Sequence, residues 1–238
     1  MDGSLVIIGA SGGIGSALAR RAAARGVALH LVGRDAGRLA ALAATLPRAT
    51  TAAADALDAT ALRGAITAAG SPIAGLAYCV GSIVLKPLGR TTEADLVDTF
   101  RLNAAGAALA VQAAAPGLAA GQGAVVLFSS VAARAGFANH VAIAAAKAAV
   151  EGLTVALAAE LAPVRVNCIA PSLTRTAIAE PLTRNAAMAE AIAKQHPIPR
   201  LGEAEDAAAL ADFLLSPAAA WITGQVIGVD GGRSTLRG

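Results

Sequence analysis

The first 19 residues change from a strand pattern to a helix pattern across a glycine-rich turn. Residues 5–8 form an uninterrupted apolar run of leucine, valine and isoleucine, and residues 9–15 contain four glycines. Residues 16–19 are small or apolar and include good helix formers. This succession predicts a buried strand, a tight turn and a helix.

The same alternation continues to the end of the chain. Short apolar runs predict further strands at residues 27–32, 50–54, 75–79, 124–128, 164–169 and 225–229. Longer helical patterns predict helices at residues 36–45, 59–69, 93–115, 141–161, 177–194 and 203–215. Regular alternation implies right-handed crossovers and a parallel sheet covered on both faces. We therefore predict an α/β fold: a single doubly wound, Rossmann-type domain over residues 1–238, with a seven-stranded parallel sheet and its ligand at the carboxyl ends of the strands.

The glycines of the first turn suit the binding of a phosphate. Gly9 lets the chain turn sharply off the strand, and Gly13 and Gly15 carry no Cβ, so a pyrophosphate can approach the backbone. Free N–H groups and the positive end of the helix dipole then attract the negative charge. An ordinary flexible turn would carry the same glycines, but the strand before it and the helix after it favour a nucleotide site. Ser11 and Ile14 complete this candidate cofactor-binding loop.

Composition narrows the class of protein. Apolar residues make up 56% of the 238 residues but aromatic residues only 3%, a balance typical of closely packed, alanine-rich helices. Each long apolar stretch is interrupted by glycine, proline or a charge, and the chain enters a strand without a basic leader. We therefore expect a cytoplasmic protein with neither a membrane span nor a secretory signal.

Charge and cysteine content further limit the class of protein and its partners. The formal net charge of +3 is small and the basic residues are scattered, so nucleic-acid binding gains no support. Cys79 and Cys168 lie at the ends of predicted strands, where buried reduced thiols are common, and two cysteines are too few for a metal site. The expected partner is a small-molecule substrate, with no metal.

Several short motifs follow the glycine loop in a fixed order. They are Asp55-Ala56 after the third strand, Asn103 in a long helix, Ser129-Ser130 after the fifth strand, Lys147 near the start of a helix, Pro171-Ser172 after the sixth strand, Ile222-Thr223-Gly224-Gln225 and Asp230-Gly231-Gly232. With these motifs the whole chain resembles the short-chain dehydrogenase/reductase family. The resemblance implies an oxidoreductase that transfers a hydride to or from a nicotinamide cofactor.

The resemblance also implies roles for individual residues. Asp55 and Ala56 would lie against the adenine ring, and Lys147 would bind the nicotinamide ribose. Asn103, Ser130 and Lys147 match three members of the family's catalytic set. Further candidate cofactor contacts are Gly81, Pro171, Thr174 and Thr176.

The fourth member of that catalytic set is missing. The family places a tyrosine four residues before the lysine, one helical turn away on the same face, and this chain has Ile143 there. Ala146 replaces the usual serine before the lysine, and Tyr78-Cys79-Val80-Gly81 keeps only the last glycine of the family's Asn-Asn-Ala-Gly. An isoleucine has no proton to donate, so a reductase of this sequence needs another acid.

Three alternatives remain for the chemistry. His140 lies seven residues before Lys147, the spacing at which enoyl reductases of the family place their tyrosine, and an imidazole can act as an acid toward an activated C=C bond. A histidine that opens a helix is also commonly a surface or capping residue, and those reductases generally lack the serine kept here as Ser130. Alternatively, water or the substrate supplies the proton to a carbonyl. In the third alternative the chain is a non-catalytic cofactor binder: a scaffold, a sensor or a partner subunit. We favour an enzyme.

The end of the second strand bears on the choice of cofactor. A carboxylate there would bond the ribose of NAD and repel the extra phosphate of NADP, but this chain has Gly33 followed by Arg34. A guanidinium can bind a phosphate bidentately. Asp35 could instead serve the ribose, with Arg34 a solvated turn residue. We predict NADP(H), with NAD(H) as second choice.

Residues 172–199 correspond to the substrate loop of the family, a mobile lid. Its basic side chains could attract an anionic substrate, but we interpret them as the solvated face of two helices. These side chains are Arg175, Arg184, Lys194 and His196.

The two long helices at residues 93–115 and 141–161 carry alanine on several faces, more than one buried stripe requires. Small residues let helices approach closely at a symmetric interface, although a compositional bias would give the same pattern. Together with the family resemblance, this leads us to expect a homotetramer built on these helices.

Overall fold

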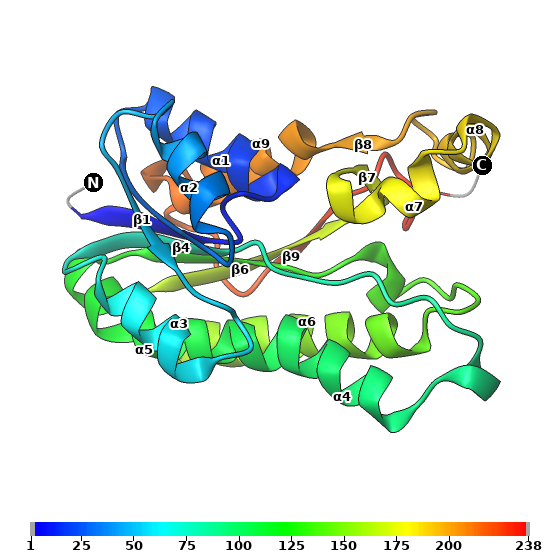
Figure 1. Ribbon diagram of the computed structural model, residues 1–238, viewed down its shortest axis with the longest axis horizontal. Coiled ribbons are helices and arrows are strands. Elements are labelled where there is room, and N and C mark those ends of the chain that lie inside the picture. The colour runs from blue at the N-terminus through cyan, green and yellow to red at the C-terminus, as the bar shows by residue number, and fades with distance from the viewer. Residues whose placement is uncertain (1–2, 237–238) are drawn as a thin grey trace.

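A parallel seven-stranded sheet forms the centre of the molecule. The computed structural model describes residues 3–236 (Figure 1) and orders the strands β3-β2-β1-β4-β5-β6-β9. The strands are β1 (Ser4–Ile8), β2 (Ala28–Gly33), β3 (Ala49–Ala53), β4 (Ile73–Tyr78), β5 (Ala124–Phe128), β6 (Arg165–Pro171) and β9 (Val226–Val229). All neighbouring pairs in this sheet are parallel, which confirms the predicted doubly wound α/β fold.

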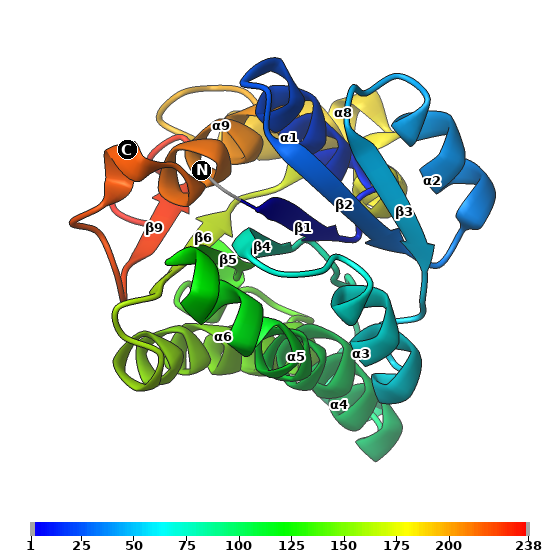
Figure 2. The same ribbon diagram turned by 90° about the vertical axis from the view of Figure 1, so that its left-hand side faces the viewer.

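Helices cover both faces of the sheet. Figure 2 shows α1 and α9 over one face and α3, α4, α5 and α6 over the other. The helices are α1 (Gly13–Ala24), α2 (Ala36–Ala43), α3 (Ala59–Thr67), α4 (Glu93–Phe100), α5 (Gly106–Gly121), α6 (Val141–Glu160) and α9 (Ala204–Leu215). Because the central strands are buried on both sides, they are continuously apolar rather than alternating.

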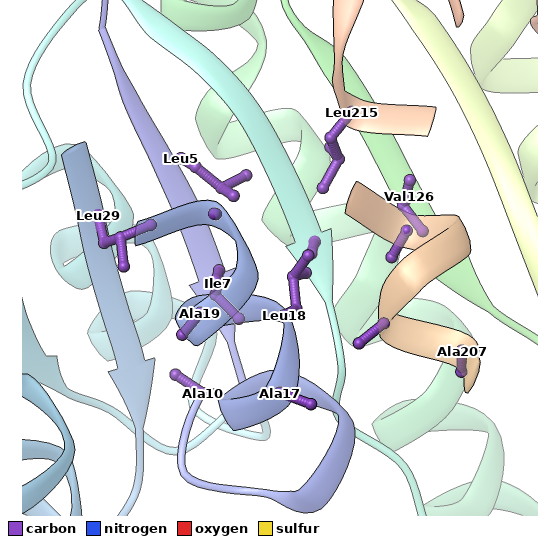
Figure 3. Close-up of a cluster of buried hydrophobic side chains, with 14 of the residues drawn as sticks. Leu5, Ile7, Ala10, Ala17, Leu18, Ala19, Leu29, Val126, Ala207 and Leu215 are labelled. Atoms are coloured by element: carbon purple, nitrogen blue, oxygen red, sulfur yellow. The ribbon is translucent and has the colours of Figure 1, made fainter. Parts of the chain in front are cut away.

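Strand β1 contributes to a separate core on each face. Leu5 and Ile7 pack with Leu18 of α1 and with residues of α9, as Figure 3 shows. Val6 and Ile8 join the core formed with α3 and α5. The end of β1, where the glycine turn begins, is therefore held at the middle of the sheet.

The long helix predicted at residues 93–115 is interrupted and extends further. A π-helical turn at Arg101–Ala105 separates α4 from α5, and α5 continues to Gly121 with Pro116 inside it. The stretch after the proline stays helical against β4, where a side chain in place of Gly117 would collide with Ile73. Tertiary packing thus overrides the local helix-breaking signal.

The region predicted as helical at residues 177–194 consists of short helical pieces, and a small sheet joins its flanks. The pieces are a 3-10 turn (Ala177–Ala179), α7 (Glu180–Thr183), α8 (Ala186–Ala193), β7 (Thr174–Arg175) and β8 (Gly202–Glu203). Asn185 starts α8 by accepting a hydrogen bond from the Met188 N–H at 3.0 Å, a capping role that asparagine favours. The pairing of β7 with β8 has no signal in the local sequence pattern.

Two helical stretches are long and apolar enough, by length and composition alone, to cross a bilayer: Glu93–Gly121 and Val141–Glu160. The expectation that interruptions rule out such stretches therefore does not hold. In this fold α5 packs on β4 and α6 packs on β6. Some of the apolar residues of both helices are therefore buried in the core.

Candidate active site

A cavity of about 770 Å³ opens at the carboxyl ends of the strands. Residues that follow each of the strands β1 to β6 contribute to its wall. The candidate residues in the wall are Gly9, Ser11, Gly13, Ile14, Arg34, Asp55, Ala56, Gly81, Ser130, His140, Lys147, Pro171, Thr174 and Thr176. Gly15 and Asn103 lie behind the wall, against Gly9 and Gly81 respectively.

The glycine turn leaves no room for side chains at two positions. Gly9 has a φ of +79°, and a Cβ there would lie 2.8 Å from the Cys79 carbonyl oxygen. A Cβ on Gly15 would collide with the Gly9 carbonyl oxygen. Helix α1 therefore starts in direct contact with the turn, as the glycine pattern predicts.

The start of α1 offers unpaired N–H groups beside the cavity. Gly12 occupies the N-cap position and supplies no side-chain acceptor, and the first turn has no acidic residue. The positive end of the helix dipole is therefore not neutralised by its own first turn. Such a helix start suits a phosphate group.

The residues after β2 form the outer lip of the cavity. The Asp35 carboxylate accepts the Arg38 N–H at 2.9 Å and thereby caps α2. The Arg38 guanidinium donates to the Ser11 carbonyl oxygen at 2.8 Å, and Arg34 is exposed beside it. Two guanidinium groups therefore flank the glycine loop, while the nearby carboxylate is engaged by backbone.

The wall continues after β3. Asp55 accepts the Leu57 N–H at 2.9 Å, which fixes its carboxylate at the edge of the cavity, and Ala56 is buried next to it. These two residues, expected against an adenine ring, lie in the same cavity as Arg34.

Lys147 is the one buried lysine among residues 3–236. Its Nζ donates to the Phe128 carbonyl oxygen at 2.8 Å, and it lines the cavity. Burial lowers the pKa of Lys147 to about 8, and the neighbouring Cys168 and Cys79 partly offset that effect. The ammonium keeps N–H donors available for a ligand that carries hydroxyl or other acceptor groups.

Asn103 is presented by the π-helical turn. Its Nδ2 donates to the Thr99 carbonyl oxygen at 2.8 Å and to Ser82 Oγ at 3.1 Å. Its Oδ1 is buried and is the one buried side-chain N or O atom without a partner among residues 3–236. A Cβ on Gly81 would lie 3.0 Å from this Oδ1 and 3.3 Å from Lys147 Nζ. The missing side chain at Gly81 therefore keeps open the space between the amide and the ammonium.

Ser130 and Ile143 line the same part of the cavity as Lys147. Ser130 Oγ accepts the Ala132 N–H at 3.2 Å, so its hydroxyl proton remains available for another acceptor. Ile143 is only 5% exposed and lies one turn before Lys147 on α6. It presents an apolar surface where the family resemblance leads one to expect a phenol.

His140 lies at the start of α6 and at the cavity wall. Its Nδ1 is 2.7 Å from the Ala138 carbonyl oxygen, and its ring centroid is 5.3 Å from that of Phe137. Because a carbonyl oxygen can only accept, Nδ1 carries a proton. Nε2 is then the ring nitrogen left to exchange a proton with a substrate.

Two residues in or near the site have roles that no local sequence pattern predicts. Arg233, just after Asp230-Gly231-Gly232, lines the cavity, and no local pattern signals that a residue so near the chain end would return there. Tyr78 donates its hydroxyl to the Leu102 carbonyl oxygen at 2.7 Å and so supports the π-helical turn. A tyrosine in an apolar strand gives no sign of that role.

The basic residues of the substrate loop have mixed surroundings. Arg175 pairs with Glu203 at 3.4 Å and Lys194 with Glu190 at 2.7 Å, and Arg184 is exposed. His196 is different: it is buried, with Nε2 2.8 Å from Ser172 Oγ. The interpretation of His196 as part of a solvated face is therefore wrong, because its ring joins the loop to the end of β6.

Comparison with curated proteins places the chain among oxidoreductases. Residues 9–234 match the family described as Enoyl-(Acyl carrier protein) reductase. The chain is 34% identical to 2-(S)-hydroxypropyl-CoM dehydrogenase 3 of Xanthobacter autotrophicus, over 98% of this chain and 96% of that protein. It is 37% identical to a tropinone reductase homolog of Arabidopsis thaliana, but that match spans 64% of this chain and 59% of the relative.

Solved structures share the fold over nearly their full length. A short-chain type dehydrogenase/reductase from Mycobacterium ulcerans has a TM-score of 0.91 and 33% identity, over 100% of this chain and 92% of that one. A gluconate 5-dehydrogenase from Burkholderia cenocepacia, in complex with NADP and tartrate, has a TM-score of 0.91 and 27% identity, over 99% and 96%. A 3-oxoacyl-[acyl-carrier protein] reductase from Brucella melitensis, with bound NAD, has a TM-score of 0.87 and 28% identity, over 99% and 92%. The chain thus belongs to the short-chain dehydrogenase/reductase family of oxidoreductases, which bind nicotinamide cofactors.

Proposed function

We propose that this protein is an NADP(H)-dependent oxidoreductase that transfers a hydride to a small carbonyl or activated C=C substrate and uses a proton donor other than tyrosine. The observation that carries the proposal is that the open start of α1 and the buried Lys147 ammonium face one cavity. The helix start suits a pyrophosphate, and the ammonium suits the hydroxyl groups of a ribose. When bound, the nicotinamide supplies the hydride.

The residues after β2 support NADP(H) over NAD(H). Asp35 is engaged in capping α2, so its carboxylate is not free to bond a ribose without giving up the cap. Arg34 and Arg38 line the cavity, and within residues 3–236 neither forms an ion pair with a carboxylate. Two such guanidinium groups suit the extra phosphate of NADP(H). The similar structures from Burkholderia and Brucella contain NADP and NAD respectively. The proposed preference for NADP(H) therefore rests on the residues of this chain.

The chain's own residues orient the reactants. Lys147 is anchored through Phe128 and holds its remaining donors toward the cavity. Ser130 can donate its hydroxyl proton to a substrate oxygen, because its Oγ lone pair already accepts the Ala132 N–H. Ile143 excludes water from the adjoining wall.

His140 is the protein group best placed to give the proton. Nδ1 is committed to the Ala138 carbonyl, so Nε2 carries a proton only in the imidazolium form. In the balanced reaction one carbon of the substrate gains the hydride that a bound nicotinamide would supply, and Nε2 gives its proton to the carbonyl oxygen or to the neighbouring carbon. Reduction by this route is slowed in His140→Asn, because the amide of asparagine cannot give up a proton.

The test is oxidation of NADPH with a panel of ketones and activated alkenes, run beside a cofactor-binding titration. Turnover of either class supports the proposal, and the His140→Asn variant then separates imidazole from water as the proton source. Binding without turnover of any substrate supports the second candidate function, a non-catalytic cofactor binder. The observation that favours this second candidate is the buried isoleucine at position 143.

We also propose a cytoplasmic homotetramer. Apolar side chains of α4 and α6 that do not enter the core remain exposed, including Val97, Phe100 and Val155. Contiguous exposed apolar residues on helices favour association. Cys79 and Cys168 are free thiols, which suits a reducing compartment.

A further inference from the structure

We propose that Arg233 binds the anionic group of the substrate, a carboxylate, and that the substrate is therefore a small acid with an apolar body. The inference rests on the proposed function, because it names the substrate class of the same cavity.

The chain returns to the cavity after the last strand. Gly231 and Gly232, with φ of +61° and +88°, turn the backbone directly after β9. The Arg233 N–H donates to the Asp230 carbonyl oxygen at 3.2 Å, which fixes the direction in which the side chain leaves the turn. Arg233 then lines the cavity that also contains His140 and Lys147.

The guanidinium is held in place by neutral partners. Its Cζ lies 4.8 Å from the centroid of the Phe137 ring, and its Nη2 donates to Gln195 Oε1. Both partners are neutral, and no carboxylate forms an ion pair with Arg233 within residues 3–236. The carboxylate of Asp230, three residues earlier, accepts hydrogen bonds from Gly232 and Ser234.

Partial burial removes part of the hydration of this charge. It lowers the pKa of Arg233, and the coulombic effect of Asp230 opposes that shift. An anion beside the guanidinium would offset the lost hydration. The planar fork of an arginine matches the two oxygens of a carboxylate.

Most of the cavity wall on the side of α6 and the substrate loop is apolar. The other charged groups in the cavity wall besides Lys147, namely Arg34, Asp35, Arg38 and Asp55, follow β2 and β3 at the opposite edge of the sheet. Phe137, Ile143, Leu182, Met188 and Ile192 supply apolar wall on the side of α6 and the substrate loop. One cation among apolar side chains suits a ligand with one anionic group and a hydrocarbon body.

The position also fits the chemistry. Phe137 contacts both Arg233 and His140, so the anion-binding group and the candidate proton donor share one aromatic neighbour. A reducible carbon within a few bonds of the carboxylate would then lie near His140. Short oxo acids and unsaturated acids have this arrangement.

Other basic residues of the substrate loop do not offer the same site. Arg175 and Lys194 are paired with acids, and Arg184 is exposed and absent from the cavity wall. Arg184→Gln is therefore a matched control for Arg233→Gln: both remove one arginine charge from the same end of the molecule.

The test compares two non-reducible probes of equal length, hexanoate and hexanamide, by isothermal titration of the protein with NADPH present. We expect wild type to bind hexanoate about tenfold or more tightly than hexanamide, as a charge-assisted pair implies. Arg233→Gln removes the preference and leaves hexanamide binding unchanged, Arg233→Lys restores part of it, and Arg184→Gln keeps it. Equal binding of the two probes by wild type, no binding of either, or a preference that survives Arg233→Gln overturns the proposal.

A second pair separates this inference from the proposed function. NADPH oxidation is followed with 2-oxohexanoate and with its methyl ester. Turnover of the acid at a lower KM than the ester, with that difference lost in Arg233→Gln, supports both proposals. Turnover of the ester with no advantage for the acid overturns the role of Arg233 alone. A hexanoate preference without turnover of any oxo acid, ketone or alkene overturns the catalytic function alone.

Discussion

Ile143 and Lys147 occupy one face of α6, and together they define the chemistry that remains open to this site. The lysine places a charge beside the cavity, and the isoleucine presents an apolar side chain that has no proton to donate. From the sequence, the lysine, the serine and the missing phenol could be placed through the resemblance to the short-chain dehydrogenase/reductase family, which implies their order and spacing. The return of Arg233 to the cavity could not, because it depends on where β9 ends in three dimensions.

Replacing Ile143 with tyrosine should create or increase ketone reduction. The new hydroxyl would lie one turn from Lys147 and facing the cavity, and a positioned general acid is worth about 10²- to 10⁴-fold in rate. The measurement is NADPH oxidation with a small ketone. Ile143→Phe is the control, since it adds the ring without the hydroxyl; equal rates in the two variants would contradict the prediction.

Lys147 should make the stability of the protein depend on pH in the alkaline range. Its pKa falls from 10.5 in the unfolded chain to about 8 in the fold. Between these values the unfolded chain binds more protons, so this residue makes the free energy of unfolding rise with pH, by at most about 3 kcal/mol in full.

Burial raises the pKa of Cys79 and Cys168 to about 12. Above their usual pKa these thiols therefore make the free energy of unfolding fall as the pH rises. The contribution of Lys147 is therefore measured as a difference: the free energy of unfolding of wild type minus that of Lys147→Met, from urea unfolding at each pH from 7 to 10. We expect wild type to gain stability relative to the variant as the pH rises. A constant difference across this range would show that the lysine is not desolvated.

At the scale of elements, strands were easier to predict than the breaks in helices. The run at residues 124–128 coincides with β5, because a short apolar stretch between a glycine and a serine has few alternatives. The π-helical turn inside the long helix has no local signal, since its cause is tertiary. Tyr78 reaches from β4 to the Leu102 carbonyl, and a side chain at Gly106 would collide with the tyrosine hydroxyl.

Tyr78→Phe should loosen this turn. Loss of the hydrogen bond to Leu102 should cost about 1–2 kcal/mol of stability and lower turnover, because the turn presents Asn103. Thr154→Val is a matched control: it removes another buried hydrogen bond from a side chain to a backbone carbonyl, within α6. Urea unfolding and turnover are measured for both variants. A Tyr78→Phe enzyme with full turnover would show that the turn holds its shape without the hydroxyl.

At the scale of the whole molecule, α4 and α6 cover one face of the sheet and expose apolar residues on their outer side. The alanine-rich pattern predicted close helix contacts, but a single chain does not determine how many copies assemble. We expect light scattering after size exclusion to give about four times the chain mass of 23.2 kDa.

Val155→Glu, on the outer face of α6, should reduce that mass. Leu88→Glu is the control, because Leu88 is also apolar and exposed but lies outside the two helices. A wild-type mass equal to one chain would contradict the expected assembly. So would loss of the assembly in both variants.

The most direct test of the account is a calorimetric titration of the purified protein with NADPH and with NADH, repeated for Gly13→Val. A side chain at Gly13 would lie within 2.6 Å of Thr176 at the mouth of the cavity. We predict that wild type binds NADPH about tenfold or more tightly than NADH, as the Arg34 and Arg38 guanidinium groups in the cavity wall imply, and that Gly13→Val abolishes binding of both. Failure of wild type to bind either cofactor at millimolar concentration, or undiminished binding by Gly13→Val, would contradict the account.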